Sequence, residues 1–106
     1  MLTTEDRRIF DEFSGIVRGR FPKARLWAYG SRARGSAAQD SDFDIFVVLD
    51  RVDEDIDRWI RSIAWETGFK NDRVITTIVV DEEQFEQGPF SESTLVENIL
   101  RDGISA

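Results

Sequence analysis

The chain has 106 residues, 41% hydrophobic and 33% charged, a composition typical of a soluble globular protein, and we expect residues 1–106 to form one domain. It contains no cysteine and no histidine, which excludes disulfides, thiolate metal sites and the commonest general base, so a metal site would need oxygen ligands that suit Mg²⁺, Mn²⁺ or Ca²⁺. Its formal net charge of -7 argues against generic nucleic-acid binding, which depends on neutralising phosphates.

The first part of the chain predicts a helix, a strand and a second, short helix. Thr3 or Thr4 can cap the first helix, with Asp6 in the position of a capping box. Apolar residues then recur at helical spacing until the chain reaches Pro22; they are Ile9, Phe10, Phe13, Ile16 and Val17. A strand over Arg25–Tyr29 follows and stops at a Gly-Ser pair, after which residues 31–34 can form the short helix.

The second part alternates strands with helices. Phe43–Leu49 is a continuous apolar run, typical of a strand in the middle of a sheet, and residues 73–80 predict another strand because they are rich in β-branched side chains. Between them a helix begins at Asp53 and ends near Gly68, and a last helix begins at Ser93. The expected buried stripes of these helices are Ile56, Trp59, Ile60 and Ile63, and Leu95, Val96, Ile99 and Leu100. Helices that alternate with strands predict a small α/β or α+β domain.

Two properties of the whole sequence bear on location and ligands. No apolar run reaches the roughly 18 residues that a membrane helix needs, and the N-terminal residues MLTTEDRRIF lack the apolar stretch of a signal peptide. We therefore expect a cytoplasmic protein without a membrane segment. Residues 1–36 have a net charge of +4 and residues 37–106 one of -11, so a phosphate-bearing ligand could meet a basic patch; ordinary solvated surfaces are the alternative.

Two polar motifs interrupt the apolar pattern at the ends of successive strands. Gly30 lets the backbone approach a ligand closely, and Ser31 adds a hydroxyl and the N–H groups of a helix start, as a phosphate site requires. An ordinary turn is the alternative for this pair. Asp42 and Asp44 head the next strand, where both carboxylates share one face, roughly 6.6 Å apart, and could hold divalent cations. The alternative there is an acidic loop that faces water.

The two motifs are more informative together than separately. Ten residues separate them, RARGSAAQDS, long enough for a short helix and a return into the same sheet beside the first strand. A phosphate site and a cation site would then share one end of the sheet. Such an arrangement can hold a nucleoside triphosphate by its phosphates and its metal together.

The segment YGSRARGSAAQDSDFDIFVVL resembles the signature of the minimal nucleotidyltransferases (MNT), small relatives of the polymerase-beta superfamily. The leading helix, the helix after Leu49 and the segment EEQFEQGPFSESTLVENILRDGI also resemble this family. The resemblance implies a mixed sheet flanked by helices, ATP as substrate, Mg²⁺ or Mn²⁺ as cofactor, and transfer of a nucleoside monophosphate to a hydroxyl. Many such proteins resemble antitoxins that pair with a helical HEPN ribonuclease toxin and can adenylylate it, so a HEPN-type partner is also implied.

The same resemblance assigns the site residues. Those implied to bind the nucleotide are Gly30, Ser31, Arg32 and Arg34. The implied catalytic residues, which are also the metal ligands, are Asp42 and Asp44. For the two arginines, exposure to solvent without a ligand is the alternative.

One element of the family pattern is missing from the sequence. Catalytic members carry a third carboxylate on a neighbouring strand, where RVITTIVVD places Thr76. Asp72 lies too far along that strand, roughly 13 Å away, and Asp81 has the opposite side-chain parity. We therefore expect catalysis to be weak or lost unless a partner supplies the acid.

Three functions are compatible with these motifs. The first is a nucleotidyltransferase that uses ATP and a divalent metal to modify a hydroxyl of a partner protein or small molecule. The second is an antitoxin-like binding module that keeps nucleotide binding, or only the fold, and masks another protein. A DxD glycosyltransferase is disfavoured, because 106 residues leave little room for a sugar-nucleotide domain and an acceptor site.

Trp65 suggests a protein interface. At 100° per residue it lies about 180° around its helix from Ile56, near Arg58 and Arg61. An outward tryptophan beside arginines is typical of interfaces, either in a homo-oligomer or with a partner protein. The alternative is that another part of this domain covers it.

Overall fold

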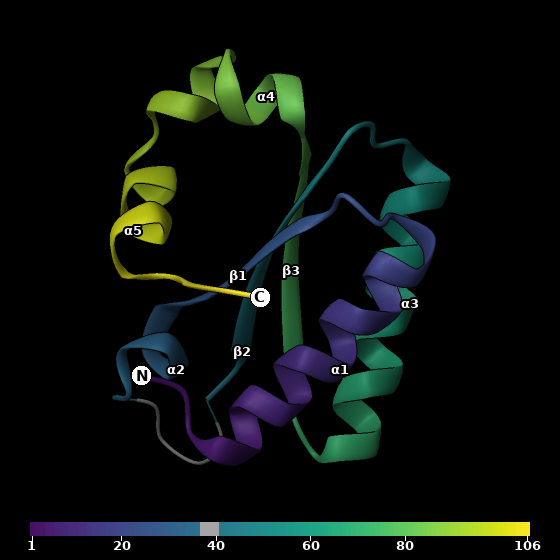
Figure 1. The fold of residues 1–106 in the computed structure, drawn as a ribbon, viewed down its shortest axis with the longest axis vertical. Coiled ribbons are helices and arrows are strands. Elements are labelled where there is room, and N and C mark those ends of the chain that lie inside the picture. Colours follow the sequence, from purple (N-terminus) through teal and green to yellow (C-terminus); the bar gives the residue numbers. More distant parts are fainter. Residues whose placement is uncertain (37–40) are drawn as a thin grey trace.

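A four-stranded mixed sheet runs through the centre of the computed structural model, which describes residues 1–36 and 41–106 (Figure 1). Its strands are β1 (Arg25–Tyr29), β2 (Phe43–Leu49), β3 (Ile75–Asp81) and β4 (Ile104–Ser105), in the order β3-β2-β1-β4. β2 pairs with β1 in the antiparallel sense and with β3 in the parallel sense. This arrangement confirms the expected fold class, a mixed sheet flanked by helices.

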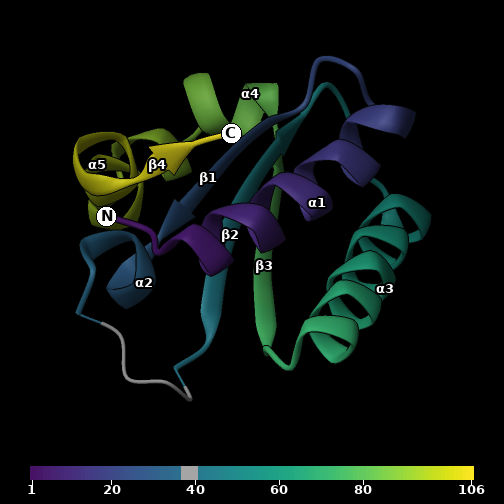
Figure 2. The same ribbon diagram turned by 60° about the horizontal axis from the view of Figure 1, so that its bottom comes forward.

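The helices lie on both faces of the sheet (Figure 2). Two long helices, α1 (Thr4–Arg20) and α3 (Glu54–Asn71), cover one face. The other face is covered in part by shorter elements: α4 (Glu82–Glu86), the 3₁₀ turn η1 (Pro89–Glu92) and α5 (Thr94–Asp102). The five-residue helix α2 (Gly30–Arg34) follows directly on β1. None of the described helices is long and apolar enough to cross a membrane.

Side-chain alternation along the strands divides the apolar core between the two faces. On the side of α1 and α3, the odd-numbered residues of β2, such as Phe43 and Ile45, pack against buried side chains such as Phe13. On the other side, Phe46 packs with Ile99 and other residues of the shorter helices. β2 is therefore apolar on both faces, as expected for a central strand, and its one polar residue is Asp44.

Capping side chains set the beginnings of the predicted helices. The Thr3 hydroxyl accepts the Asp6 N–H at 3.0 Å, and the Asp53 carboxylate accepts the Ile56 N–H at 2.8 Å. Ser93 caps α5 in the same way. Asp6 does not complete the expected capping box, because its carboxylate turns inward to an ion pair with Arg32.

The structure differs from the sequence-based expectations mainly where tertiary contacts decide. α3 runs three residues beyond Gly68 and stops only where Asp72 takes a left-handed conformation, with φ of 58°. Ile16 and Leu100, expected to be buried, are 40% and 57% exposed. The additional elements α4, η1 and β4 were not predicted, since each is too short to leave a periodic pattern.

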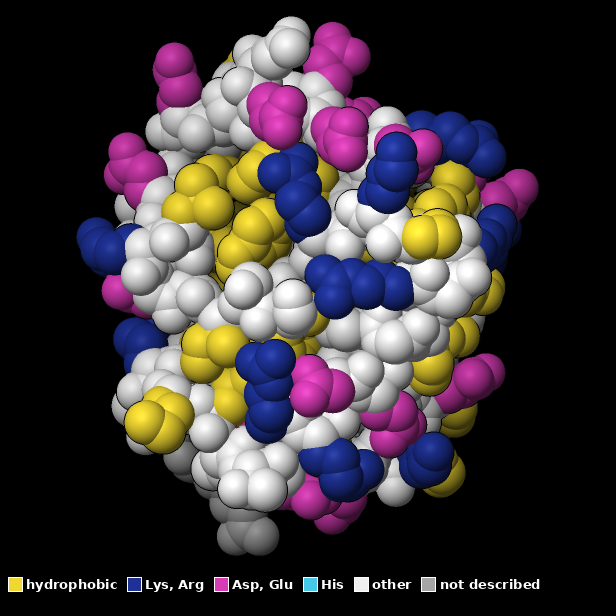
Figure 3. Space-filling view, in the orientation of Figure 1, with side chains coloured by type: hydrophobic (Ala, Val, Ile, Leu, Met, Phe, Trp, Pro, Cys, Tyr) yellow, Lys and Arg dark blue, Asp and Glu magenta, His cyan; other side chains and the backbone are white. Residues whose placement is uncertain are grey.

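The uneven charge of the sequence appears on the surface. Figure 3 shows acidic side chains gathered over α4 at the top of the molecule, in the orientation of Figure 1. The exposed acids there include Glu82, Glu83 and Glu86. Lysine and arginine side chains are spread over the rest of this face (Figure 3).

Candidate functional site

Three strands bring one row of polar residues together at the end of the sheet where β1 stops and β2 and β3 start. In the strand register, Tyr29 on β1 is the partner of Asp44 on β2, and Asp44 is the partner of Thr76 on β3. Directly paired residues project from the same face of a sheet. This face is the one that α4 and α5 cover only in part.

Thr76 holds Asp44 directly. Its hydroxyl Oγ1 donates a hydrogen bond of 2.6 Å to Asp44 Oδ1. The structure thus places Thr76 beside Asp44, at the position where the family resemblance implies a carboxylate and this sequence has none. Asp81 lies at the other end of β3 and caps α4, while Asp72 ends α3, so neither occupies the Thr76 position.

Asp42 and Asp44 differ in their surroundings. Asp44 is half-buried within β2, whereas Asp42 is exposed and lies two residues earlier, just before the strand begins. In the described ranges, residues 1–36 and 41–106, no cluster of three or more acidic side chains could hold a metal ion. Asp44 lies next to the Thr76 hydroxyl, and with Asp42 two residues earlier it provides oxygen ligands of the kind that Mg²⁺ and Mn²⁺ accept.

Gly30, directly after β1, lies against the Asp44 carboxylate. Its φ is +76°, a left-handed conformation that glycine adopts without strain. A Cβ atom at this position would lie 2.5 Å from Asp44 Oδ2, so only glycine lets the turn come this close to the carboxylate. Ser31 follows at the start of α2 and is partly exposed. The structure therefore brings Gly30 against the Asp44 carboxylate, and Ser31 is the next residue in the chain.

The two arginines of α2 have different environments. Arg34 is exposed at the end of the helix. Arg32 is 6% exposed, and its guanidinium pairs with Asp6 at 3.0 Å. It also donates to the carbonyl of Ser41 at 2.7 Å. The guanidinium of Arg32 is thus directed to α1 and to the backbone that leads into β2. The family resemblance had implied that this residue binds the nucleotide.

Tyr29 is a member of the site that the sequence reading did not assign. Burial, and in second place the negative charge of Asp44, raises the pKa of its phenol above the usual value. The sequence offered one indication that Tyr29 belongs to the site, namely its position directly before Gly30 at the end of a strand. The Asp6–Arg32 pair was also missed, because 26 residues separate its members.

The comparisons with known proteins agree with this geometry. Residues 10–104 match the nucleotidyltransferase domain family. No curated protein sequence matches the chain.

Several solved structures share the fold. A toxin–antitoxin complex with AMP-PNP has a TM-score of 0.62 and 22% identity over 97% of this chain and 72% of that chain. A complex of the tri-AMPylated HEPN toxin of Shewanella oneidensis with its MNT antitoxin has a TM-score of 0.57 and 20% identity over 94% of this chain and 70% of the other. A putative nucleotidyltransferase from Sulfolobus solfataricus has a TM-score of 0.52 and 22% identity over 95% and 81%.

Proposed function

The chain belongs to the nucleotidyltransferase domain family, and we propose that it binds ATP with a divalent metal and transfers the nucleoside monophosphate to a hydroxyl group of a partner protein, with pyrophosphate as the leaving group. The observation that carries this proposal is the meeting of Gly30 with the Asp44 carboxylate at the end of the sheet. It unites a turn that a phosphate can approach with carboxylates that can hold a cation. We take residues 1–106 as one such domain.

Each residue of the site has a proposed task. Asp42 and Asp44 would hold Mg²⁺ or Mn²⁺, which when bound polarises phosphoryl oxygens and offsets their negative charge. Gly30 lets the turn lie against Asp44, so that phosphates held at the turn would be close to the metal, and the Ser31 hydroxyl donates to them. Arg34, exposed on α2, can reach out to them as a further donor. For Arg32 we propose a positioning role, because its guanidinium holds α1, α2 and the backbone before β2 together.

The deprotonation of the acceptor hydroxyl is the weak step of this site. The Thr76 hydroxyl donates to Asp44 and is not a base near neutral pH. A positioned general base typically contributes about 10² to 10⁴ in rate. We therefore propose slow transfer by the isolated protein, with a base that comes from the acceptor.

The proposed acceptor is a helical protein of the HEPN type. The support is the fold shared with an MNT antitoxin that was solved in complex with an AMPylated HEPN toxin. The presence of Thr76 favours a second candidate function, an antitoxin-like module that binds nucleotide and masks its partner without modifying it. Mass spectrometry of the partner after incubation with ATP distinguishes the two, since only the enzyme leaves a covalent nucleotide.

The first test of the proposal is titration calorimetry with ATP. We expect binding that requires Mg²⁺ or Mn²⁺ and that Asp42→Asn with Asp44→Asn abolishes. The double variant should remain folded, with unchanged or higher thermal stability without metal, because two neighbouring carboxylates repel each other.

The matched control is Asp50→Asn with Asp55→Asn, which removes the same charge from two exposed acids outside the site. This control should keep the wild-type affinity. Unchanged metal-dependent affinity in the Asp42 and Asp44 variant would refute the assignment of the site.

A further inference from the structure

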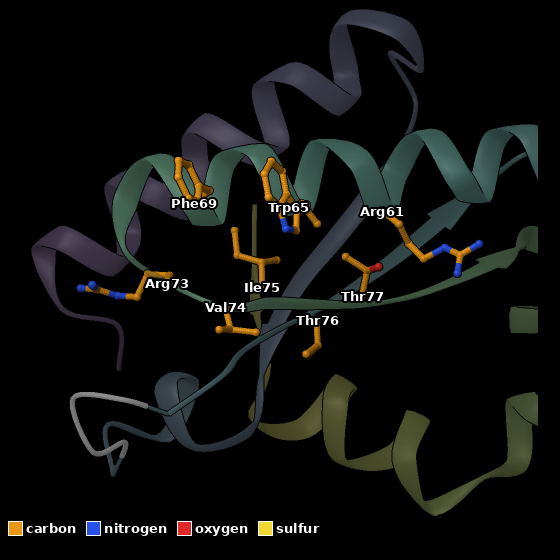
Figure 4. Close-up of a pocket in the computed structure, with 9 residues that line it drawn as sticks. Arg61, Trp65, Phe69, Arg73, Val74, Ile75, Thr76 and Thr77 are labelled. Carbon is orange, nitrogen blue, oxygen red and sulfur yellow. The ribbon is translucent and has the colours of Figure 1, made fainter.

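A groove separates α3 from β3 on the side away from the other strands. Its volume is about 500 Å³, and its walls include Arg61, Trp65 and Phe69 from α3 and Val74 and Thr77 from the β3 segment (Figure 4). The rings of Trp65 and Phe69 stack with centroids 5.2 Å apart and an interplanar angle of 11°. They are 66% and 77% exposed, and Val74 is 62% exposed. The outward position predicted for Trp65 is therefore confirmed, within a larger apolar patch.

The floor of this groove is an open sheet edge. In the strand order of the described residues, β3 has β2 on one side and no strand on the other. An edge strand presents unpaired N–H and C=O groups, which proteins usually protect with lysine, proline or a bulge. The seven residues of β3, ITTIVVD, contain neither lysine nor proline. A seven-residue edge without these protections is a template for pairing with another strand.

The charges along this edge indicate which strand fits. Residues 70–74, before β3, carry two basic and one acidic side chain, whereas its C-terminal end carries three consecutive acids, Asp81, Glu82 and Glu83. An acidic segment of another protein would be repelled at that end. A basic segment would meet Arg61 and Arg73 in the groove, although each already forms an ion pair within the chain, with Asp57 and Asp6. A strand with the same charges in the opposite direction matches both ends. The edge is thus complementary to itself in the antiparallel sense.

We propose that a second copy of this chain docks on this groove and that β3 pairs antiparallel with its own equivalent about a two-fold axis. Pairing centred on Thr77 sets Arg73 opposite Asp81 of the partner subunit at both ends of the edge. It also brings the Trp65–Phe69 stacks of both copies to the same interface, where exposed aromatic side chains become buried. Such a contact is isologous and closes as a dimer, so it does not propagate into a filament.

Thr76 belongs to both the groove and the candidate site, since it lines the groove while its hydroxyl donates to Asp44. Thr76 points to the opposite side of β3 from Ile75 and Thr77, away from α3 (Figure 4). Its partner Asp44 lies on that same opposite face. The proposed association is argued from the open edge of β3 and the Trp65–Phe69 stack, so it does not rest on the proposed function.

Sedimentation velocity of the purified protein over a range of concentrations up to about 100 μM tests this proposal, since affinities tighter than this are resolved there. We expect a dimer for the wild type. Trp65→Ala with Phe69→Ala should raise the dissociation constant at least about thirtyfold, as the loss of a buried aromatic anchor typically does. Both side chains are mostly exposed, so circular dichroism should show a folded variant.

Two further variants sharpen the result. Leu100→Ala, the matched control, removes an exposed apolar side chain from α5 and should leave the dimer unchanged. Glu82→Lys with Glu83→Lys should weaken the dimer, because it makes the acidic end of the edge basic. Two results would overturn the proposal. One is a wild type that is monomeric at the highest concentration, which would leave the groove to a different protein. The other is a dimer that neither the Trp65 and Phe69 variant nor the Glu82 and Glu83 variant weakens.

Discussion

Thr76 stands where the resemblance to the family led us to expect a third carboxylate, and this expectation can be tested chemically. Thr76→Asp places a carboxylate beside Asp44, where it can accept the proton of an acceptor hydroxyl. We expect transfer to a hydroxyl acceptor to be at least about tenfold faster, the low end of what a positioned base contributes. The measurement is the single-turnover rate with radiolabelled ATP.

Thr76→Asn is the matched control for that experiment, because it has the same shape as aspartate but cannot act as a base. It should not raise the rate. If the wild type already transfers rapidly and Thr76→Asp changes nothing, the acid lies elsewhere and Asp72 is the next residue to replace.

Tyr29 reports on the charge of Asp44. It is the one tyrosine of the sequence, so the ultraviolet absorbance of tyrosinate follows it alone. Since burial and then the Asp44 charge raise its pKa, we expect it to ionise above the usual value of about 10. Asp44→Asn should lower the pKa only in part, because burial is the larger cause. A Tyr29 pKa that Asp44→Asn does not change would contradict this arrangement.

The same shift predicts a pH dependence of stability. The folded state binds the phenol proton more tightly than the unfolded state does, so the contribution is fully present below the unfolded pKa of about 10. It is lost as the pH rises from there through the higher pKa of the folded state. Thermal unfolding followed across this range should show the loss, and Tyr29→Phe should reduce it.

At the scale of elements, the short helix α2 carries one buried arginine, Arg32, and one exposed arginine, Arg34, for which we propose contact with the ligand. Arg32 and Asp6 form a buried ion pair, with side chains 6% and 4% exposed. Arg32→Ala should lower the free energy of unfolding by about 3 kcal/mol, the low end for breaking a buried pair. The low end applies because Arg73, 3.4 Å from Asp6, continues to offset its charge.

Arg34→Ala is the matched control from the same helix. Its side chain is exposed, so stability should change by less than about 0.5 kcal/mol while the affinity for ATP falls. Chemical denaturation and calorimetry on both variants give the comparison. The opposite result, a stable Arg32→Ala protein with weakened ATP binding, would return the phosphate-binding role to Arg32.

At the scale of the whole molecule, helices cover the two faces of the sheet to different extents. α1 and α3 seal one face with fully buried side chains such as Phe10, Phe13 and Ile60. The shorter C-terminal elements cover the other face only in part, with Phe46 and Ile99 beneath them. The uncovered end of that face is where Asp44 and Thr76 lie, and the open edge of β3 is next to it. The proposed ligand would bind on the face of Asp44 and the proposed second copy along the edge of β3, and Thr76 is the residue that the two surfaces share.

The sequence by itself determined the elements with strong local signals. The strands Arg25–Tyr29 and Phe43–Leu49 and the helix starts after Thr3, Asp53 and Ser93 all follow from apolar runs and capping side chains, which act within a few residues. The nucleotidyltransferase family was also recognisable, because its motif is short and lies in one segment. The adjacency of Gly30 and Asp44 could be anticipated from a ten-residue connection between two strands.

Tertiary structure alone decided the contacts between distant residues. The strand register makes Thr76 the hydrogen-bonding neighbour of Asp44, 32 residues away, and packing directs Arg32 to Asp6. The place of β3 at the sheet edge, which leaves Trp65 and Phe69 beside unpaired backbone, is likewise set by the order of the strands. Strand order and long-range ion pairs depend on which surfaces bury together, and local periodicity carries no information about that choice.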